Sequence, residues 1–229
     1  AYRRASGEYL CDGVKLLEEA LRWNAPLKTV VLSECVDAPT LPSGVRAVRV
    51  PADVMRSISP METPQGALFT VRLPDTALPE TLSGAHYLVL DGVQDPGNVG
   101  TILRTLDAFD FDGLLLLEGC ADPWSVKTVR SSMGAVFRLP CVQLPLADAL
   151  ARLKTAGLPV YATALHEDSV PLSSVSLGRA AVIIGSEGQG ICQELFDAAQ
   201  GKIIIPMSPR CESLNAAVAA AIVLWQMRP

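Results

Sequence analysis

Short apolar runs alternate with helix-forming stretches along the chain from His86 onward. Runs such as Tyr87–Leu90 and Leu114–Leu117 are bounded by Gly, Pro or polar residues, a pattern typical of buried parallel strands. Further runs of this kind predict strands at Phe137–Val142, Val160–Thr163, Ala181–Ile184 and Lys202–Ile205. Helical patterns lie between most of these runs, at Gly100–Phe109, Ser125–Met133, Ala147–Ala156 and Cys192–Ala199. This alternation predicts an α/β fold in which a parallel sheet carries helices on both faces.

Residues 1–77 show a separate, smaller α/β pattern. Apolar residues at helical spacing predict a helix over Leu10–Trp23. Runs rich in β-branched residues predict strands at Lys28–Ser33, Val45–Val50 and Ala67–Val71. The stretch that follows, residues 72–84, contains two prolines and no periodicity, which marks a linker. We therefore expect two domains, residues 1–77 and residues 78–229.

Composition narrows the class of protein. Apolar residues make up 49% of the chain and the mean hydropathy is +0.30, which suffices for a packed core. No apolar run reaches the roughly 18 residues of a membrane helix, and the start of the sequence lacks the apolar stretch of a signal peptide. We therefore expect a cytoplasmic protein without a membrane partner.

Cysteine content and charge limit the kinds of site. The six cysteines are scattered without a CxxC pair, and there are only two histidines. We therefore expect buried free thiols and no metal site. The net charge is −5, with nine basic and nine acidic residues in residues 1–75 but ten and fifteen in residues 76–229. A nucleic-acid surface must then be a local patch, for which the N-terminal part is the better candidate.

Three polar loops directly follow expected strands, at residues 91–100, 185–190 and 206–215. The carboxyl ends of parallel strands are where open α/β sheets bind ligands. The glycines of these loops would let a planar ligand or a second loop approach the backbone closely. No loop matches a dinucleotide or phosphate-binding glycine motif, and Ile184 stands where a hydrolase nucleophile elbow needs glycine. A nucleotide-binding enzyme and an α/β hydrolase are therefore disfavoured.

Arg104 follows the first loop by about one helical turn and has two interpretations. It could reach a ligand bound at the loop. It could also form a surface ion pair with Asp107 or Asp110 on its own helix. Spacing alone favours the ion pair.

Polar residues of the other two loops also have structural alternatives. Glu187 is either a helix-start carboxylate or a polar group of the site. Ser213 fits an N-cap of the last helix, whereas Asn215, one step inside that helix, is harder to explain as structure. The alanines that follow leave little bulk on the helix, which suits tight helix packing or a subunit interface.

Taken together, the three loops resemble those of the SpoU (TrmH) family of RNA ribose 2′-O-methyltransferases, in the SPOUT superfamily. These enzymes use S-adenosylmethionine (AdoMet). The order, spacing and strand-end placement of the motifs agree. The matching residues are Asn98-x-Gly100-x-x-x-Arg104, then Gly185-Ser186-Glu187-Gly188-x-Gly190-Ile191, then Ile205-Pro206-Met207 leading to Ser213-Leu214-Asn215.

The resemblance implies a deep trefoil knot near the C-terminus and a homodimer whose site is completed across the interface. It implies AdoMet as methyl donor, with no metal. The residues expected at AdoMet are Thr163, Gly185, Glu187, Gly190, Ile205, Met207, Ser213 and Leu214. The catalytic, RNA-facing residues are expected to be Asn98, Arg104, Glu187, Ser213 and Asn215.

The N-terminal domain looks like the L30e-like RNA-binding domain of the same family. Basic side chains expected to meet RNA are Arg3, Arg4, Arg22, Lys127 and Arg130, although solvated charges on a helix face are an equal alternative for those of the first domain. The resemblance favours ribosomal RNA as the substrate. Transfer RNA stays open, as does a non-catalytic RNA-binding module that keeps the fold. The abrupt start at Ala1 is compatible with a missing leading segment that contributes to RNA affinity.

Overall fold

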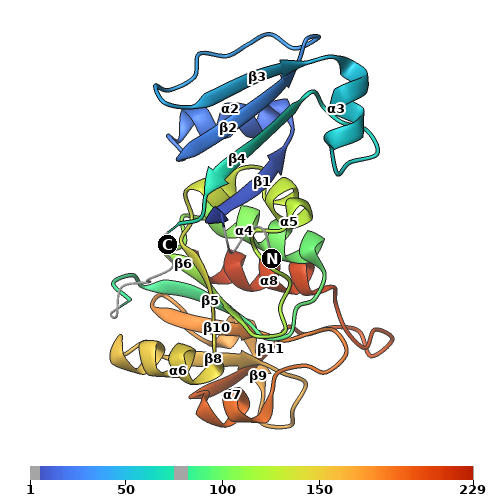
Figure 1. Ribbon diagram of the computed structural model, residues 1–229. Coiled ribbons are helices and arrows are strands. Elements are labelled where there is room, and N and C mark those ends of the chain that lie inside the picture. Colours follow the sequence, from blue (N-terminus) through green and yellow to red (C-terminus); the bar gives the residue numbers. More distant parts are fainter. Residues whose placement is uncertain (1–5, 75–81, 229) are drawn as a thin grey trace.

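A computed structural model of the chain describes residues 6–74 and 82–228, which form two separate sheets (Figure 1). We call the part up to residue 74 the N-terminal domain and the part from residue 82 the C-terminal domain. Residues 75–81 of the expected linker lie outside the described residues, as do Arg3 and Arg4. The position of the domain boundary therefore stays a prediction.

The described part of the C-terminal domain contains a seven-stranded sheet in the order β7-β6-β5-β10-β8-β11-β9. Every pair of neighbouring strands is parallel, which confirms the predicted sheet. The strands are β5 (His86–Leu90), β6 (Gly113–Leu117), β7 (Cys141–Leu144), β8 (Val160–Thr163), β9 (Val170–Pro171), β10 (Ala180–Ile184) and β11 (Gly201–Ile204).

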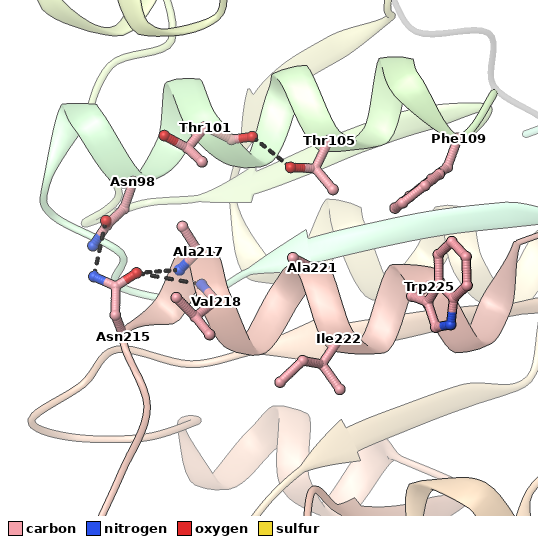
Figure 2. A pocket seen from close by; sticks show the side chains of 10 residues that line it. All are labelled: Asn98, Thr101, Thr105, Phe109, Asn215, Ala217, Val218, Ala221, Ile222 and Trp225. Carbon is pink, nitrogen blue, oxygen red and sulfur yellow. Dashed lines mark hydrogen bonds between the residues drawn. The ribbon is translucent and has the colours of Figure 1, made fainter.

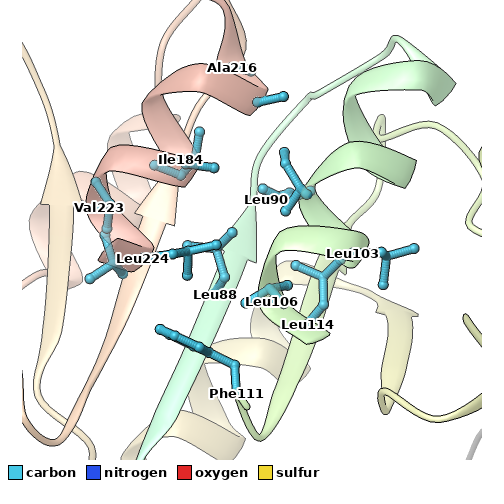
Figure 3. Packing of buried hydrophobic residues seen from close by; sticks show 14 of the residues in the cluster. Leu88, Leu90, Leu103, Leu106, Phe111, Leu114, Ile184, Ala216, Val223 and Leu224 are labelled. Carbon is cyan, nitrogen blue, oxygen red and sulfur yellow. The ribbon is translucent and has the colours of Figure 1, made fainter. Parts of the chain in front are cut away.

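Helices cover both faces of this sheet, because successive residues of a strand point to opposite faces. On one face, Leu88 and Leu90 of β5 pack with Leu103 of α4 and Leu224 of α8 (Figure 3). On the other face, alternate residues such as Val89 pack in a second cluster with residues of α6 and α7. The helical segments are α4 (Pro96–Ala108), α5 (Val126–Ser131), α6 (Leu146–Thr155), α7 (Gln193–Ala198) and α8 (Ala216–Met227), with the 3-10 turns η1 (Ala135–Phe137) and η2 (Leu172–Ser174).

Helix α4 begins four residues earlier than its apolar pattern indicates. Asp95 is its N-cap and accepts a hydrogen bond from the Asn98 N–H at 2.9 Å, with Pro96 in the first turn. This bond, more than the neighbouring Lys127, lowers the pKa of the Asp95 carboxyl. The cap fixes where α4 starts and so places Asn98 at the carboxyl edge of the sheet.

The N-terminal domain is a four-stranded sheet in the order β1-β4-β2-β3, packed against a helix. The three expected strands are confirmed. Its apolar core continues into the C-terminal domain through Val129 and Val136, and the ring of Tyr9 lies 4.9 Å from that of Trp124. The elements are β1 (Glu8–Asp12), α2 (Val14–Arg22), β2 (Leu27–Ser33), β3 (Arg46–Val50), α3 (Ala52–Ile58) and β4 (Ala67–Arg72).

Two element predictions are wrong at the contact between the domains. The helix expected over Leu10–Trp23 is split, because Gly13 has a φ of 124° and the residues before it form β1. The strand expected over Phe137–Val142 starts only at Cys141. Phe137 instead ends η1 and packs against the N-terminal core. Its apolar character therefore serves the domain contact and not a strand.

Several further expectations bear on the class of protein and the kind of site. None of the helices in the described residues combines the length and apolarity needed to cross a membrane. No group of three metal-binding side chains occurs within residues 6–74 and 82–228; metal-free chemistry stays a prediction. The cysteines are free as expected, and burial raises the pKa of the Cys141 thiol to about 12. The prediction that the thiols are buried is wrong for Cys35 and Cys211, which are exposed.

Candidate active site

A pocket of about 710 Å³ opens at the carboxyl ends of β8, β10 and β11. This is the edge at which the loops were expected to bind a ligand. The pocket contains the eight residues expected at AdoMet, and its described lining contains acidic but no Lys or Arg side chains. These eight are Thr163, Gly185, Glu187, Gly190, Ile205, Met207, Ser213 and Leu214.

The loop after β10 folds back on itself at the pocket. Ser186 and Gly190 exchange two backbone hydrogen bonds of 3.0 Å. A Cβ on Gly185 would lie 2.3 Å from the carbonyl carbon and oxygen of Gly190, which itself has a φ of 69°. Gly185 is therefore needed for the close approach of two backbone segments of one loop; approach of a planar ligand or of a second loop stays a prediction.

A polar network joins the three loops (Figure 2 shows its Asn98–Asn215 part). The Asn98 side-chain amide donates to Glu187 Oε1 at 2.9 Å and accepts at its own oxygen from the Asn215 amide at 3.0 Å. Glu187 Oε1 also accepts from the backbone N–H of Ala216, at 3.1 Å. Glu187 therefore complements the N-terminus of α8 and also lines the pocket, while its role toward a ligand stays a prediction.

Asn215, not Ser213, is the N-cap of α8. Its side-chain oxygen accepts from the N–H groups of Ala217 and Val218, at 3.0 and 3.3 Å. Ser213 lines the pocket, outside the helix. The prediction of a Ser213 cap is wrong because Asn binds the first turn from a position closer to the helix.

Arg104 projects from the exposed side of α4. Within the described residues, no hydrogen bond or ion pair holds its side chain, so the expected surface pair is not found. Its neighbour Asp107 is bound instead by Arg138, with Nε–Oδ1 and Nη2–Oδ2 distances of 2.8 and 2.7 Å. A free guanidinium on this helix can bind an anionic ligand.

A second hollow, of about 580 Å³, lies between α4 and α8 (Figure 2). We call it the α4–α8 groove; it is lined by Asn98, Thr101, Thr105, Phe109, Asn215, Ala217, Val218, Ala221, Ile222 and Trp225. Val218, Ile222 and Trp225 are 48%, 38% and 56% exposed. Asn98 and Asn215 line this groove, and Asn98 also binds Glu187 of the pocket.

Other expected side chains already have partners. The Thr163 hydroxyl donates to the Ile183 carbonyl at 2.8 Å, so that toward AdoMet it could act only as an acceptor. Lys127 lies 3.4 Å from Asp95 in an exposed ion pair, and the exposed Arg22 lies 3.7 Å from the partly buried Glu19. Arg130 is on α5, beside Lys127 and away from the described pocket lining.

Sequence reasoning missed the segment after β8 as pocket lining. Leu165 and His166 belong to the pocket, as does Phe196, whose ring centroid is 5.1 Å from that of His166. Their position directly after Thr163 was the available signal. It also missed Asp91, which accepts from the Cys192 N–H at 2.7 Å and ties the first loop to the second.

Comparison with known proteins agrees with this geometry. The family model "SpoU rRNA Methylase family" matches residues 85–225, and "MRM3-like substrate binding domain" matches residues 1–68. The 23S rRNA (guanosine(2553)-2′-O)-methyltransferase RlmP of Bacillus subtilis is 33% identical, over 99% of this chain and 90% of that relative.

Solved structures show the same similarity. A TrmH-family protein from Porphyromonas gingivalis has a TM-score of 0.88 at 35% identity, covering 99% of this chain and 92% of that one. An AdoMet-bound rRNA methyltransferase from Sinorhizobium meliloti also has a TM-score of 0.88, at 31% identity, covering 99% and 88%.

The fold is that of a SPOUT-type RNA methyltransferase. The chain belongs to the SpoU rRNA methylase family. This confirms the predicted family and enzyme class, and it favours the enzyme over a non-catalytic binding module.

Proposed function

We propose that this protein transfers the methyl group of AdoMet to a ribose 2′-hydroxyl of ribosomal RNA. One observation carries the proposal: a pocket with acidic and glycine-rich lining shares a polar network with a helix that presents the unpaired Arg104. The names of the similar proteins, an rRNA 2′-O-methyltransferase among them, support the same substrate.

The pocket suits AdoMet by size and charge. Small-molecule pockets hold about 300–1,000 Å³, lined by apolar surface with few polar groups. Apolar side chains such as Ile205 and Leu214 suit the adenosine, and Glu187 and Glu212 suit a sulfonium cation. AdoMet would supply a methyl group on a sulfonium, an excellent leaving group. The backbone around Gly185, Ile205 and Leu214 would hold and orient it.

Arg104 then acts on the RNA. A guanidinium has a pKa above about 12 and offers no lone pair, so it is a poor general base. In our proposal it binds a substrate phosphate and stabilises the charge that develops on the attacking ribose oxygen. Asn98, Glu187 and Asn215 hold the loops in register, and Ser213 lies at the pocket edge toward the RNA. Alignment of the two reactants is the main contribution of these groups.

The α4–α8 groove supports a homodimer. It is apolar and open, and Arg104 lies on the same helix as the groove residues Thr101 and Thr105. Arg104 is not among the residues that line the AdoMet pocket. We propose that a second copy covers the groove and that Arg104 completes the partner's site. We also propose that the chain forms a deep trefoil knot near its C-terminus and that the protein is cytoplasmic.

The N-terminal domain would bind the RNA. The match of residues 1–68 to a substrate-binding domain supports this role. RNA phosphates would be contacted by Arg3, Arg4 and Arg22 of this domain. Lys127 and Arg130 of α5 in the C-terminal domain would also contact them. The side chains of Lys127 and Arg22 are themselves exposed, 66% and 73%, and their ion pairs cost little to break.

The direct test is transfer of labelled methyl from AdoMet to separated ribosomal and transfer RNA that lack native modification. We expect label in ribosomal RNA, protection of the labelled site from alkaline cleavage, and loss of transfer in Arg104→Ala with AdoMet affinity unchanged. Arg179→Gln is the control, because Arg179 binds only the carbonyls of Ala156 and Gly157 at the far end of β10. Label in transfer RNA alone, or equal loss of AdoMet affinity and rate, would overturn the proposal.

A further inference from the structure

Arg138 connects the two domains. It follows η1, and its guanidinium binds Asp107 of α4 with two nitrogens. Its third nitrogen, Nη1, donates to Glu19 Oε2 of α2 at 2.9 Å and to the Gly134 carbonyl at 3.1 Å. The guanidinium carbon also lies 5.0 Å from the ring centroid of Trp23.

These contacts are well shielded for an ion-pair cluster. The side chains of Arg138, Glu19 and Asp107 are 23%, 28% and 20% exposed. Burial lowers the pKa of Arg138, but the hydrogen bonds and charges of Asp107 and Glu19 outweigh it, so that its pKa is raised. A Cβ on Gly134 would lie 2.9 Å from Glu19 Cβ, which shows how closely α2 approaches this segment. Bidentate, partly shielded pairs of this kind persist where exposed pairs do not.

Asp107 stands three residues after Arg104 on α4. Side chains at this spacing are neighbours on a helix surface, and opposite charges there attract. Arg138 neutralises the charge of Asp107, and without it Asp107 would attract Arg104 more strongly. Within the described residues, Arg138 is bound to Asp107 and no hydrogen bond or ion pair holds Arg104.

We propose that Arg138 is a positioning residue for methyl transfer: by binding Asp107 it keeps Arg104 available to the RNA, and by binding Glu19 it fixes the N-terminal domain relative to α4. The proposal rests on the proposed role of Arg104 at the RNA. Arg138 itself does not touch the reactants. Its effect reaches the reaction through the charge of Asp107.

The fold does not depend on Arg138 alone. Tyr9 packs on Trp124, and Val129 and Val136 join the N-terminal core, so that apolar contacts hold the domains together without the ion pairs. Arg138→Gln should therefore leave the enzyme folded. This separates the positioning role from a simple loss of structure.

The test compares five full-length proteins: wild type, Arg138→Gln, Asp107→Asn, the double variant, and Arg179→Gln as a matched control. The first readout is the single-turnover rate of methyl transfer to unmodified ribosomal RNA at saturating RNA and AdoMet. We expect Arg138→Gln to lower this rate about two-fold, with Asp107→Asn and the control near wild type. The double variant should recover the rate, because a neutral amide at position 107 cannot capture Arg104. The RNA concentration that gives half-maximal rate should be raised in Arg138→Gln. It should remain raised in the double variant, because the bond from Arg138 to Glu19 is missing in both.

The second readout needs no substrate. Exchange of the Arg104 Nε–H, followed by nitrogen-15 NMR, should slow in Arg138→Gln and return to the wild-type rate in the double variant. Unchanged exchange in Arg138→Gln overturns the proposal whatever the activity. Changed exchange without methyl transfer by any protein would instead overturn the proposed function. A double variant as slow as Arg138→Gln would show that Arg138 acts only as a structural tie.

Discussion

The pocket at the strand ends and the α4–α8 groove lie on opposite sides of one polar network, but they differ in chemistry. The pocket is lined largely by loop residues, with Gly185 where a side chain would collide and carboxylates at Glu187 and Glu212. The groove is built from helix side chains, mostly apolar, and has no Gly, Glu or Asp in its described lining. The first suits a small cationic ligand, and the second suits another protein surface. The difference indicates a site in two parts, joined through Asn98 and Asn215.

The largest effect is expected from a substitution that adds a side chain inside the AdoMet pocket. In Gly185→Val the new side chain would meet the Gly190 backbone, which cannot move away without opening the Ser186–Gly190 bridge. We expect AdoMet affinity to fall at least about 100-fold, or about 2.7 kcal/mol, by calorimetry. Gly178→Ala is the control, because a Cβ there meets nothing within 4 Å. Normal AdoMet binding by the Gly185 variant would show that the pocket is misassigned.

The groove side should respond differently. Trp225→Glu places a charge in the apolar groove, and Trp225 packs on Phe109 with ring centroids 5.8 Å apart. We expect dissociation to monomers by light scattering and at least a ten-fold loss of methyl transfer, with AdoMet affinity within about three-fold of wild type. Ile58→Glu, at an apolar residue of α3 that is 47% exposed, is the control. A dimer that survives Trp225→Glu would assign the groove to another partner.

The network between the two parts can be tested at Asn215. Asn215→Ala removes the N-cap of α8 and should cost about 1 kcal/mol in the free energy of unfolding. Asn215→Ser restores an acceptor for the cap, but its shorter side chain has no second polar atom to reach Asn98 while it caps the helix. We expect chemical denaturation to show recovered stability for Ser, while methyl transfer stays reduced. Full recovery of both stability and methyl transfer in Asn215→Ser would show that Asn215 acts only as the N-cap of α8.

The smallest effect concerns the thiols. Burial raises the pKa of Cys141 to about 12, and burial also raises the pKa of Cys120 above its ordinary value, so both thiols stay protonated and unreactive at neutral pH. Cys35 and Cys211 are exposed. A thiol reagent at pH 8 should label these two in the native protein and the buried thiols only after unfolding. Rapid native labelling of Cys141 would contradict the packing of β7.

Sequence periodicity was sufficient for the parallel sheet and most helix positions of the C-terminal domain. It failed where tertiary contacts give an apolar residue another task, as at Phe137, which packs against the other domain. Periodicity could show only that Arg104 lies on a helix. It could not show that Arg104 is unpaired, because Arg138, which binds Asp107, is distant from both in the sequence. Likewise, the choice of Asn215 over Ser213 as N-cap depends on where α8 starts, which side-chain geometry decides.

The central claim is that the pocket of one subunit and Arg104 of another form one site. The most direct measurement mixes subunits carrying Gly185→Val with subunits carrying Arg104→Ala, allows them to exchange, and follows methyl transfer to ribosomal RNA. Each variant alone should be inactive. A mixed dimer would hold one complete site, so random pairing should restore about a quarter of wild-type activity. No recovery, with mixed dimers present, would place pocket and Arg104 in the same subunit and contradict the claim.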